Sequence, residues 1–261
     1  MTATDRHQVQ AVLFDLDDTL LDTASAFAAA VAAMAAEFLP HLEADRYPEV
    51  LATWRVDSGG HYQAHVDGVV DYRTQRFARA QQIQEQFGGA VLDDAGYDRW
   101  AQVWDRAFSG AWAAFEDTAV ILAALRSAGL AVGCVTNAGT EQQSAKLAAV
   151  GLTDAVPLLV TLDTFGVGKP DPRVFHEGVR LLGFEPHQVM YVGDEPVIDA
   201  RAATAAGLHG VWLDRPGRRR DHAGEDADAL RAEGIAVIEG LAELTDLIPA
   251  LTTTANVPPR G

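Results

Sequence analysis

The sequence predicts an α/β protein whose core is a doubly wound parallel sheet, with an α-helical subdomain inserted after the first strand. Three observations support this fold class. Short apolar runs recur along the chain, helical stretches with recognisable ends lie between most of them, and one long interval contains helices but no convincing strand. Parallel strands need helical crossovers, so a sheet covered by helices on both faces explains the alternation.

Six short runs are the predicted strands, and each is apolar throughout, which is typical of strands buried on both faces. In chain order they are residues 11–14, 131–136, 158–161, 189–193, 210–213 and 235–238. The helix after the second run should begin at Thr140, where Gln143 would complete a capping box, and it should end at Gly151.

The interval 22–112 interrupts this alternation with Ala-rich amphipathic stretches such as TASAFAAAVAAMAAEFL. Roughly ninety residues are far more than a crossover between neighbouring strands requires. We therefore expect a discontinuous core formed by 9–21 and 113–250 and an inserted helical cap at 22–112, above the tip of the first strand. Residues 251–261 should form a disordered tail.

The composition excludes several classes of protein. A formal net charge of −17 disfavours nucleic acid or an anionic membrane as a partner. The single cysteine, Cys134, allows no intrachain disulfide. No apolar run is long enough to span a bilayer, and the N-terminus has no secretory pattern. We expect a cytoplasmic protein that is a monomer or a homodimer.

Polar residues gather where the predicted strands end, which is where ligands bind in an open parallel sheet. In chain order they are Asp15, Asp17, Thr136, Asn137, Lys169, Asp194 and Asp199. Four carboxylates packed together would repel one another, and a divalent cation such as Mg²⁺ would relieve that repulsion. The hydroxyl and the ammonium would then suit the oxygens of a phosphoryl group.

The motifs DLDDTL, VTN, KP and GD, with Asp199 following, resemble in order the four motifs of the haloacid dehalogenase superfamily. The resemblance covers residues 11 to about 215, and the insertion matches that superfamily's helical cap. It implies a phosphatase that hydrolyses a small phosphorylated metabolite. Asp15 would be the nucleophile that becomes an aspartyl phosphate, and Asp17 the general acid and then base. Thr136, Asn137 and Lys169 would hold the phosphoryl group.

The resemblance also implies a Mg²⁺ site. Asp194, the Asp15 carboxylate and the backbone carbonyl of Asp17 would be its ligands, and Asp199 would orient them or Lys169. Thr19 is expected to hydrogen-bond the loop that holds Asp17. Asp18 faces away from Asp15 by its parity, and many relatives have Gly there, so we expect a solvated turn or a local cap.

Other activities of the superfamily remain open to different degrees. A sugar-phosphate mutase shares the whole set of residues and is the alternative. A haloacid dehalogenase is disfavoured because it needs no acid at the position of Asp17, and a phosphonatase because residues 22–112 contain no lysine. A non-catalytic regulatory protein would be expected to lack at least one of these residues.

Within the expected cap, Arg73 and Arg76 are three residues apart and share a helical face. They are candidates to bind a second anionic group of the substrate, although ordinary solvated arginines give the same pattern. The tryptophans of this region are expected to form the core of the cap: Trp54, Trp100, Trp104 and Trp112.

Overall fold

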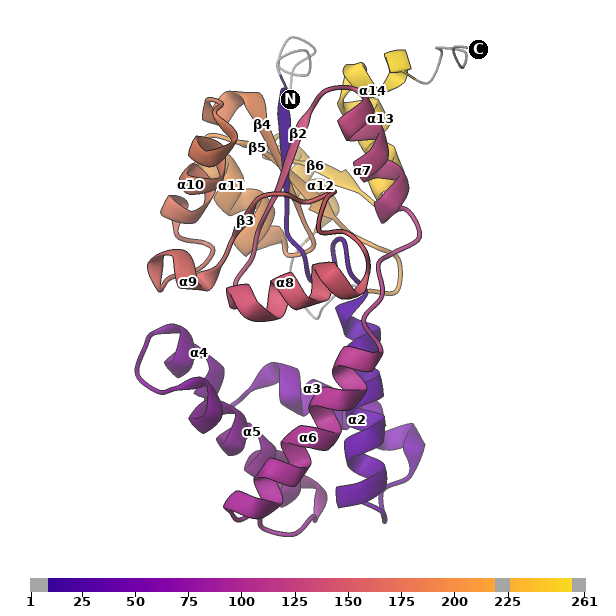
Figure 1. The fold of residues 1–261 in the computed structure, drawn as a ribbon, viewed down its shortest axis with the longest axis vertical. Coiled ribbons are helices and arrows are strands. Elements are labelled where there is room, and N and C mark those ends of the chain that lie inside the picture. The colour runs from indigo at the N-terminus through magenta and orange to yellow at the C-terminus, as the bar shows by residue number, and fades with distance from the viewer. Residues whose placement is uncertain (1–8, 219–225, 255–261) are drawn as a thin grey trace. The chain divides into compact units, whose positions relative to one another are not determined.

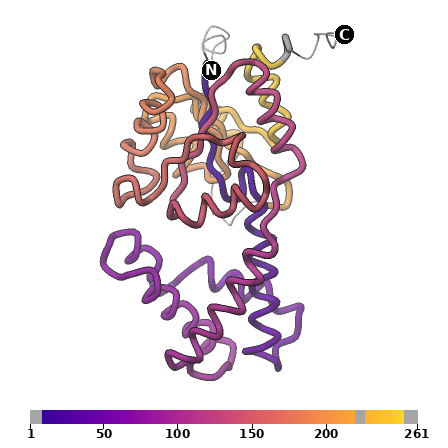
Figure 2. Tube along the Cα trace, viewed as in Figure 1, coloured from indigo at the N-terminus to yellow at the C-terminus, as the bar shows by residue number. Residues whose placement is uncertain are grey.

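The computed structural model describes residues 9–218 and 226–254, and the chain divides into two compact units (Figure 1). The core unit comprises Met1–Asp22 with Ala114–Gly261, and the inserted unit is Thr23–Ala113. Figure 2 traces the chain from β1 into the inserted unit and back to the core. No helix among the described residues is long and apolar enough to cross a membrane.

The core unit is built on a six-stranded sheet in the order β3-β2-β1-β4-β5-β6, and every neighbouring pair is parallel. The strands are β1 (Ala11–Phe14), β2 (Ala131–Val135), β3 (Leu159–Val160), β4 (Val189–Gly193), β5 (His209–Leu213) and β6 (Ala236–Ile238). All four residues of β1 are buried. The predicted fold class is confirmed, and the six apolar runs are the six strands.

Helices cover both faces of the sheet, as the alternating side chains of β1 require. Val12 and Phe14 belong to one apolar cluster with residues of α7, α13 and α14, whereas Ala11 and Leu13 belong to another with residues of α10 and α11. The helices of this unit are α7 (Thr118–Ser127), α8 (Thr140–Ala149), α9 (Leu162–Phe165), α10 (Pro172–Leu182), α11 (Ala202–Ala205), α12 (Ala227–Ala232), α13 (Leu244–Leu247) and α14 (Pro249–Thr254).

The inserted unit, which the structure describes in full, contains helices and no strand. Its helices are α2 (Thr23–Phe38), α3 (Tyr47–Val56), α4 (His61–Val66), α5 (Tyr72–Phe87) and α6 (Asp94–Gly110), with a 3₁₀ turn at Ala44–Arg46. Trp54, Trp100 and Trp104 are buried in its apolar core, and Trp112 packs against that core partly buried. The tryptophans are therefore core residues, as predicted.

The predicted disordered tail, residues 251–261, begins too early in the chain. Residues 251–254 belong to α14, and residues 255–261 lie outside the described residues. Leu251 is buried in the same apolar cluster as Val12 and Phe14. Burial of this leucine explains why the helix continues past the predicted boundary.

The turn after β1 is tighter and more buried than expected. Asp18 has a φ of +60° and donates its backbone N–H to the Leu21 carbonyl at 2.8 Å. Asp18 is also buried, so the expected solvated position is wrong. A left-handed backbone is strained for residues with a Cβ and costs Gly no such strain, so the turn holds Asp18 in an unfavourable conformation.

This geometry predicts an unusual order of stability for two variants. Asp18→Ala and Asp18→Gly lose the same side-chain contacts, but only Ala keeps the Cβ strain. We expect Asp18→Gly to be more stable than Asp18→Ala by about 1 kcal/mol in urea unfolding, because relief of about 1–2 kcal/mol of strain exceeds the entropic cost of Gly. Equal stabilities, or a more stable Ala variant, would contradict a strained turn.

Candidate active site

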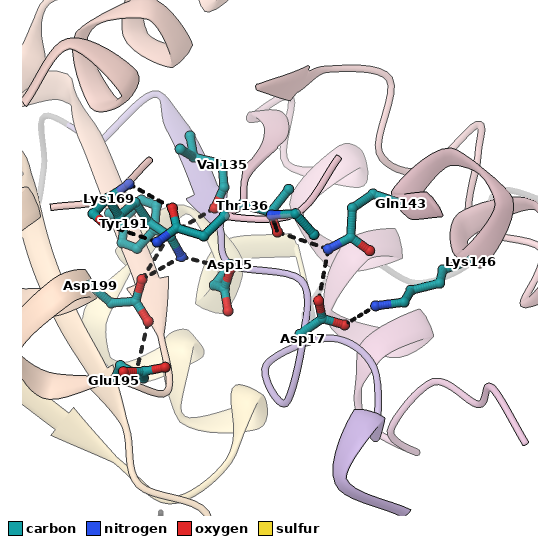
Figure 3. A network of polar contacts seen from close by, with 12 residues as sticks. Asp15, Asp17, Val135, Thr136, Gln143, Lys146, Lys169, Tyr191, Glu195 and Asp199 are labelled. Carbon is teal, nitrogen blue, oxygen red and sulfur yellow. Dashed lines mark hydrogen bonds and ion pairs between the residues drawn. The ribbon is translucent and has the colours of Figure 1, made fainter. Parts of the chain in front are cut away.

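Five of the predicted site residues lie together where the central strands end: Asp15, Asp17, Thr136, Lys169 and Asp199 (Figure 3). Sheet-like hydrogen bonding continues into them, since Asp15 donates its N–H to Val192 at 2.8 Å and Thr136 donates to Val160 at 2.9 Å. Asp15 and Thr136 are both buried, with 7% and 3% of their surface exposed. The strands therefore fix the backbone from which these two side chains project.

Lys169 lies at the centre of a buried group of polar side chains. Its Nζ donates to Asp15 Oδ1 at 2.7 Å, to Asp199 Oδ1 at 2.7 Å and to the Tyr191 hydroxyl at 3.0 Å. Asp199, carried by a π-helical turn at Pro196–Arg201, also accepts the backbone N–H of Glu195 at 3.0 Å. One ammonium thus joins two carboxylates, and sequence reasoning did not foresee Tyr191 beside it.

Charge and burial shift the pKa values of this group. Burial is the largest cause of the raised pKa of Asp15, about 7, with Asp199 and Asp17 adding to it and Lys169 opposing it. Burial works against the charged form of Lys169, but Asp15 and Asp199 outweigh it and raise the pKa of that ammonium. Lys169 is therefore cationic throughout the physiological range, whereas Asp15 titrates near neutrality in the protein alone.

Asn137 is committed to the loop that carries Lys169. Its Nδ2 donates to the Lys169 carbonyl at 2.8 Å, and its Oδ1 accepts the Lys169 N–H at 2.6 Å. This amide therefore positions the lysine. The expected direct contact between Asn137 and the phosphoryl group stays a prediction.

A second polar group surrounds Asp17, and the sequence did not indicate it. Lys146 Nζ donates to Asp17 Oδ1 at 2.5 Å, and Gln143 Nε2 donates to Asp17 Oδ2 at 2.8 Å. The same Gln143 amide reaches Thr136 Oγ1, also at 2.8 Å. Gln143 thereby connects the two strand-end residues that we expect to bind phosphate and to transfer protons.

The predicted capping box on α8 is wrong, and its failure explains why Gln143 was missed. The helix begins after Gly139, which makes no side-chain cap. Thr140 instead shares a hydrogen bond of 2.6 Å with Thr161 through their hydroxyls, which leaves Gln143 to point into the site. The composition did contain a signal for Lys146. The whole sequence has two lysines, Lys146 and Lys169, and Lys169 already belonged to the predicted site.

Three carboxylates could hold a metal ion. Oxygens of Asp15, Asp194 and Asp199 lie within 4.8 Å of one another. Asp199 already accepts bonds at both oxygens, so Asp15 and Asp194 are better suited to bind directly, with Asp199 behind Lys169. An all-oxygen, acidic donor set fits a hard divalent cation. The Asp17 carboxylate is not in this group, and the role of its backbone carbonyl stays a prediction.

Gly193 shows how closely this part of the site is packed. A Cβ added there would lie 2.4 Å from the carboxyl carbon of Asp199, a distance that no side chain tolerates. The glycine before Asp194 is therefore required by the neighbouring carboxylate.

Thr19 does not make the expected hydrogen bond. Its hydroxyl is buried and has no hydrogen-bond partner among the described residues. Arg215 supports this loop instead, because it donates to the Thr19 carbonyl at 3.1 Å and forms an ion pair with Asp117 at 2.8 Å. The loop that follows Asp17 is thus held through its backbone.

Arg73 and Arg76 have carboxylate partners within the inserted unit. Arg73 pairs with Asp94 at 3.0 Å and with Asp98 at 2.9 Å, while Arg76 pairs with Asp105 at 2.6 Å and is largely buried. These contacts explain both arginines without a ligand. Their expected role in binding substrate stays a prediction.

Comparisons with known proteins agree with the geometry. The family model for haloacid dehalogenase-like hydrolases matches residues 9–207. Phosphoserine phosphatase of Thermus thermophilus is 36% identical over 107 residues, or 41% of this chain and 43% of that protein, so the chain aligns with less than half of it. N-acetylmuramic acid 6-phosphate phosphatase of Pseudomonas aeruginosa is 31% identical over 78% of this chain and 84% of that protein.

A solved structure described as a dehalogenase with intermediate complex has the same fold. It superposes with a TM-score of 0.69 over 93% of this chain and 98% of that chain, at 22% sequence identity. A likeness at this identity shows the shared architecture alone.

The raised pKa of Asp15 predicts a pH-dependent cost of folding in metal-free protein. Its pKa is about 7 when folded, against an ordinary value of 3.8, so the folded chain holds a proton that the unfolded chain has released between these values. Stability from this group therefore falls as pH rises through that window. In urea unfolding with EDTA at pH 8, we expect Asp15→Asn to be more stable than the parent by on the order of 1 kcal/mol or more.

The same comparison at pH 4 is the control. There the parent Asp15 is protonated in the folded state, and the advantage of the Asn variant should largely disappear. An advantage of equal size at both pH values would show that ionisation of Asp15 is not its cause.

Proposed function

Because the chain belongs to the haloacid dehalogenase-like hydrolase family, we propose that it is a Mg²⁺-dependent phosphatase of small phosphorylated metabolites, with Asp15 as its nucleophile. One observation carries the proposal. Lys169 fixes Asp15 Oδ1 at 2.7 Å, while a second aspartate, Asp17, is held two residues away by its own set of donors. One carboxylate is thereby available to attack and another to transfer a proton.

In the first step, an Asp15 oxygen attacks phosphorus and the bond from phosphorus to the ester oxygen breaks. Asp17 gives its proton to that departing oxygen, so the alcohol leaves neutral and Asp15 carries an aspartyl phosphate. The described residues make no hydrogen bond to Asp15 Oδ2, which favours this oxygen as the attacking atom. Thr136 and Lys169 stabilise the charge that builds up on the phosphoryl oxygens.

In the second step, water attacks the phosphorus of the aspartyl phosphate. Asp17, now a carboxylate, takes a proton from that water, the bond from phosphorus to Asp15 breaks, and inorganic phosphate leaves. Asp15 returns as a carboxylate and Asp17 as an acid, so both residues are regenerated. Lys169 remains cationic throughout and favours the ionised form of Asp15 before and after turnover.

Asp15 and Asp194 would hold the divalent cation. When bound, it supplies positive charge that offsets the repulsion between the incoming phosphate and the carboxylates. The names of the relatives support phosphate esters as substrates, since both act on phosphorylated small molecules. Neither name identifies the ester that this chain hydrolyses.

A dehalogenase function has less support than a phosphatase function. A carbon–halogen bond releases halide, which needs no proton, whereas the alkoxide of a phosphate ester does. The Asp17 carboxylate, bound by Gln143 and Lys146, is the group that this proton requires. A mutase would use the same residues and differ in passing the phosphoryl group to a second sugar hydroxyl instead of water.

The proposal predicts Mg²⁺-dependent release of phosphate from a panel of phosphorylated metabolites. EDTA should abolish the release and Mg²⁺ should restore it. Asp15→Asn should lose activity by more than about 10³-fold, because no aspartyl phosphate can form. Asp17→Asn should lose about 10²- to 10⁴-fold in kcat, as expected for removal of a general acid and base.

Asp154→Asn is the matched control, since it makes the same change on the exposed surface of the core unit and should keep full activity. Full activity of Asp15→Asn would refute the mechanism. Phosphoryl transfer between sugar phosphates without release of phosphate would identify a mutase instead of a phosphatase.

A further inference from the structure

The distribution of lysine in this chain points to a second functional ammonium. Lysine and arginine together number 20 in the sequence, and of these only Lys146 and Lys169 are lysines. Both lysines are buried, with 2% and 6% of their surface exposed. Each also forms an ion pair with an aspartate of the DLDD segment, Lys169 with Asp15 and Lys146 with Asp17.

Burial makes the position of Lys146 costly unless its charge is compensated. Its Nζ lies 2.5 Å from Asp17 Oδ1, and its side chain reaches this carboxylate from α8, across the end of the sheet. Elsewhere the chain uses arginine, both at its surface and in the buried ion pair of Arg76 with Asp105. Lysine differs in placing a compact point charge at the end of a flexible stem, so it can contact one oxygen of Asp17 while Gln143 contacts the other.

Gln143 acts on two groups at once. It is fully buried, and its Nε2 donates to Asp17 Oδ2 and to Thr136 Oγ1, both at 2.8 Å. A carboxylate can only accept hydrogen bonds, so the Gln143 side chain must turn its NH₂ group toward Asp17 and Thr136. Thr136 Oγ1 also accepts the N–H of Ala138 at 3.3 Å. With both lone pairs of the hydroxyl used, its proton is directed elsewhere, as a donor to a phosphoryl oxygen requires.

We propose that Gln143 and Lys146 are positioning residues of the phosphoryl-transfer site, and this inference rests on the proposed function. They stand three residues apart on one face of α8 and bind the two oxygens of Asp17 separately. This fixes the plane of the carboxylate. A carboxyl oxygen has two lone pairs, so accepting one hydrogen bond is compatible with carrying a proton on the same oxygen.

Lys146 and Gln143 affect different parts of the reaction. Lys146 contacts Asp17 and so acts on proton transfer to the leaving oxygen. Gln143 contacts both Asp17 and Thr136 and so acts also on stabilisation of the phosphoryl oxygens. Variants of the two residues should therefore lose activity to different extents as the leaving group changes, because a general acid matters most when the leaving oxygen is strongly basic.

The test compares phenyl phosphate with p-nitrophenyl phosphate, which are similar in shape but differ in the basicity of the leaving phenolate. For Lys146→Met we expect kcat/KM to fall about 10-fold or more with phenyl phosphate and less than about 3-fold with p-nitrophenyl phosphate. For Gln143→Leu we expect a fall of about 10-fold with p-nitrophenyl phosphate and a larger fall with phenyl phosphate. Lys146→Arg should restore part of the Lys146→Met loss.

The ratio of the two kcat/KM values in one preparation does not depend on the fraction of folded enzyme, so a variant that folds poorly still gives an answer. Ser144→Ala, an exposed change on the same helix, is the control and should leave the ratio unchanged. Equal losses with both substrates for Lys146→Met would overturn the inference. If the unaltered enzyme releases phosphate from neither substrate nor from any metabolite, the proposed function itself fails.

Discussion

The buried contact between Lys169 and two aspartates is the constraint on which the rest of the site depends. Three charged groups excluded from water would destabilise the fold if any of them lacked its partner. The ammonium is shared between Asp15 and Asp199, and Tyr191, Asn137 and the π-helical turn hold the three groups in place. The sheet supplies the rigid base, because the backbone of Asp15 continues the pairing of β1 with β4.

Positive side chains lie beside the carboxylates of the site. Lys146 pairs with Asp17 and Lys169 is shared between Asp15 and Asp199, while oxygens of Asp15, Asp194 and Asp199 lie close enough together to hold a divalent cation. A site balanced in this way can admit an anionic phosphoryl group in spite of the strongly negative net charge of the chain. The local arrangement of charge, and not its total, decides which ligand the protein can accept.

The sequence predicted the elements that depend on local pattern. The six strands were visible because strands buried on both faces are apolar without interruption, and the strand-end residues followed from the direction of a parallel sheet. Gln143 and Lys146 were not predicted because they contact Asp17 only once α8 packs near the end of β1. That packing is tertiary structure, and the spacing of residues along a helix does not reveal it. The burial of Asp18 and Leu251 was missed for the same reason.

The confinement of lysine to the site has a practical consequence for studying the protein in solution. Reagents that acylate ε-amino groups usually report the whole surface of a protein, but here both such groups are buried. Their acylation must wait until the strand ends become exposed by local opening. The rate of modification at these two positions would therefore measure how often this end of the sheet opens, without any introduced label.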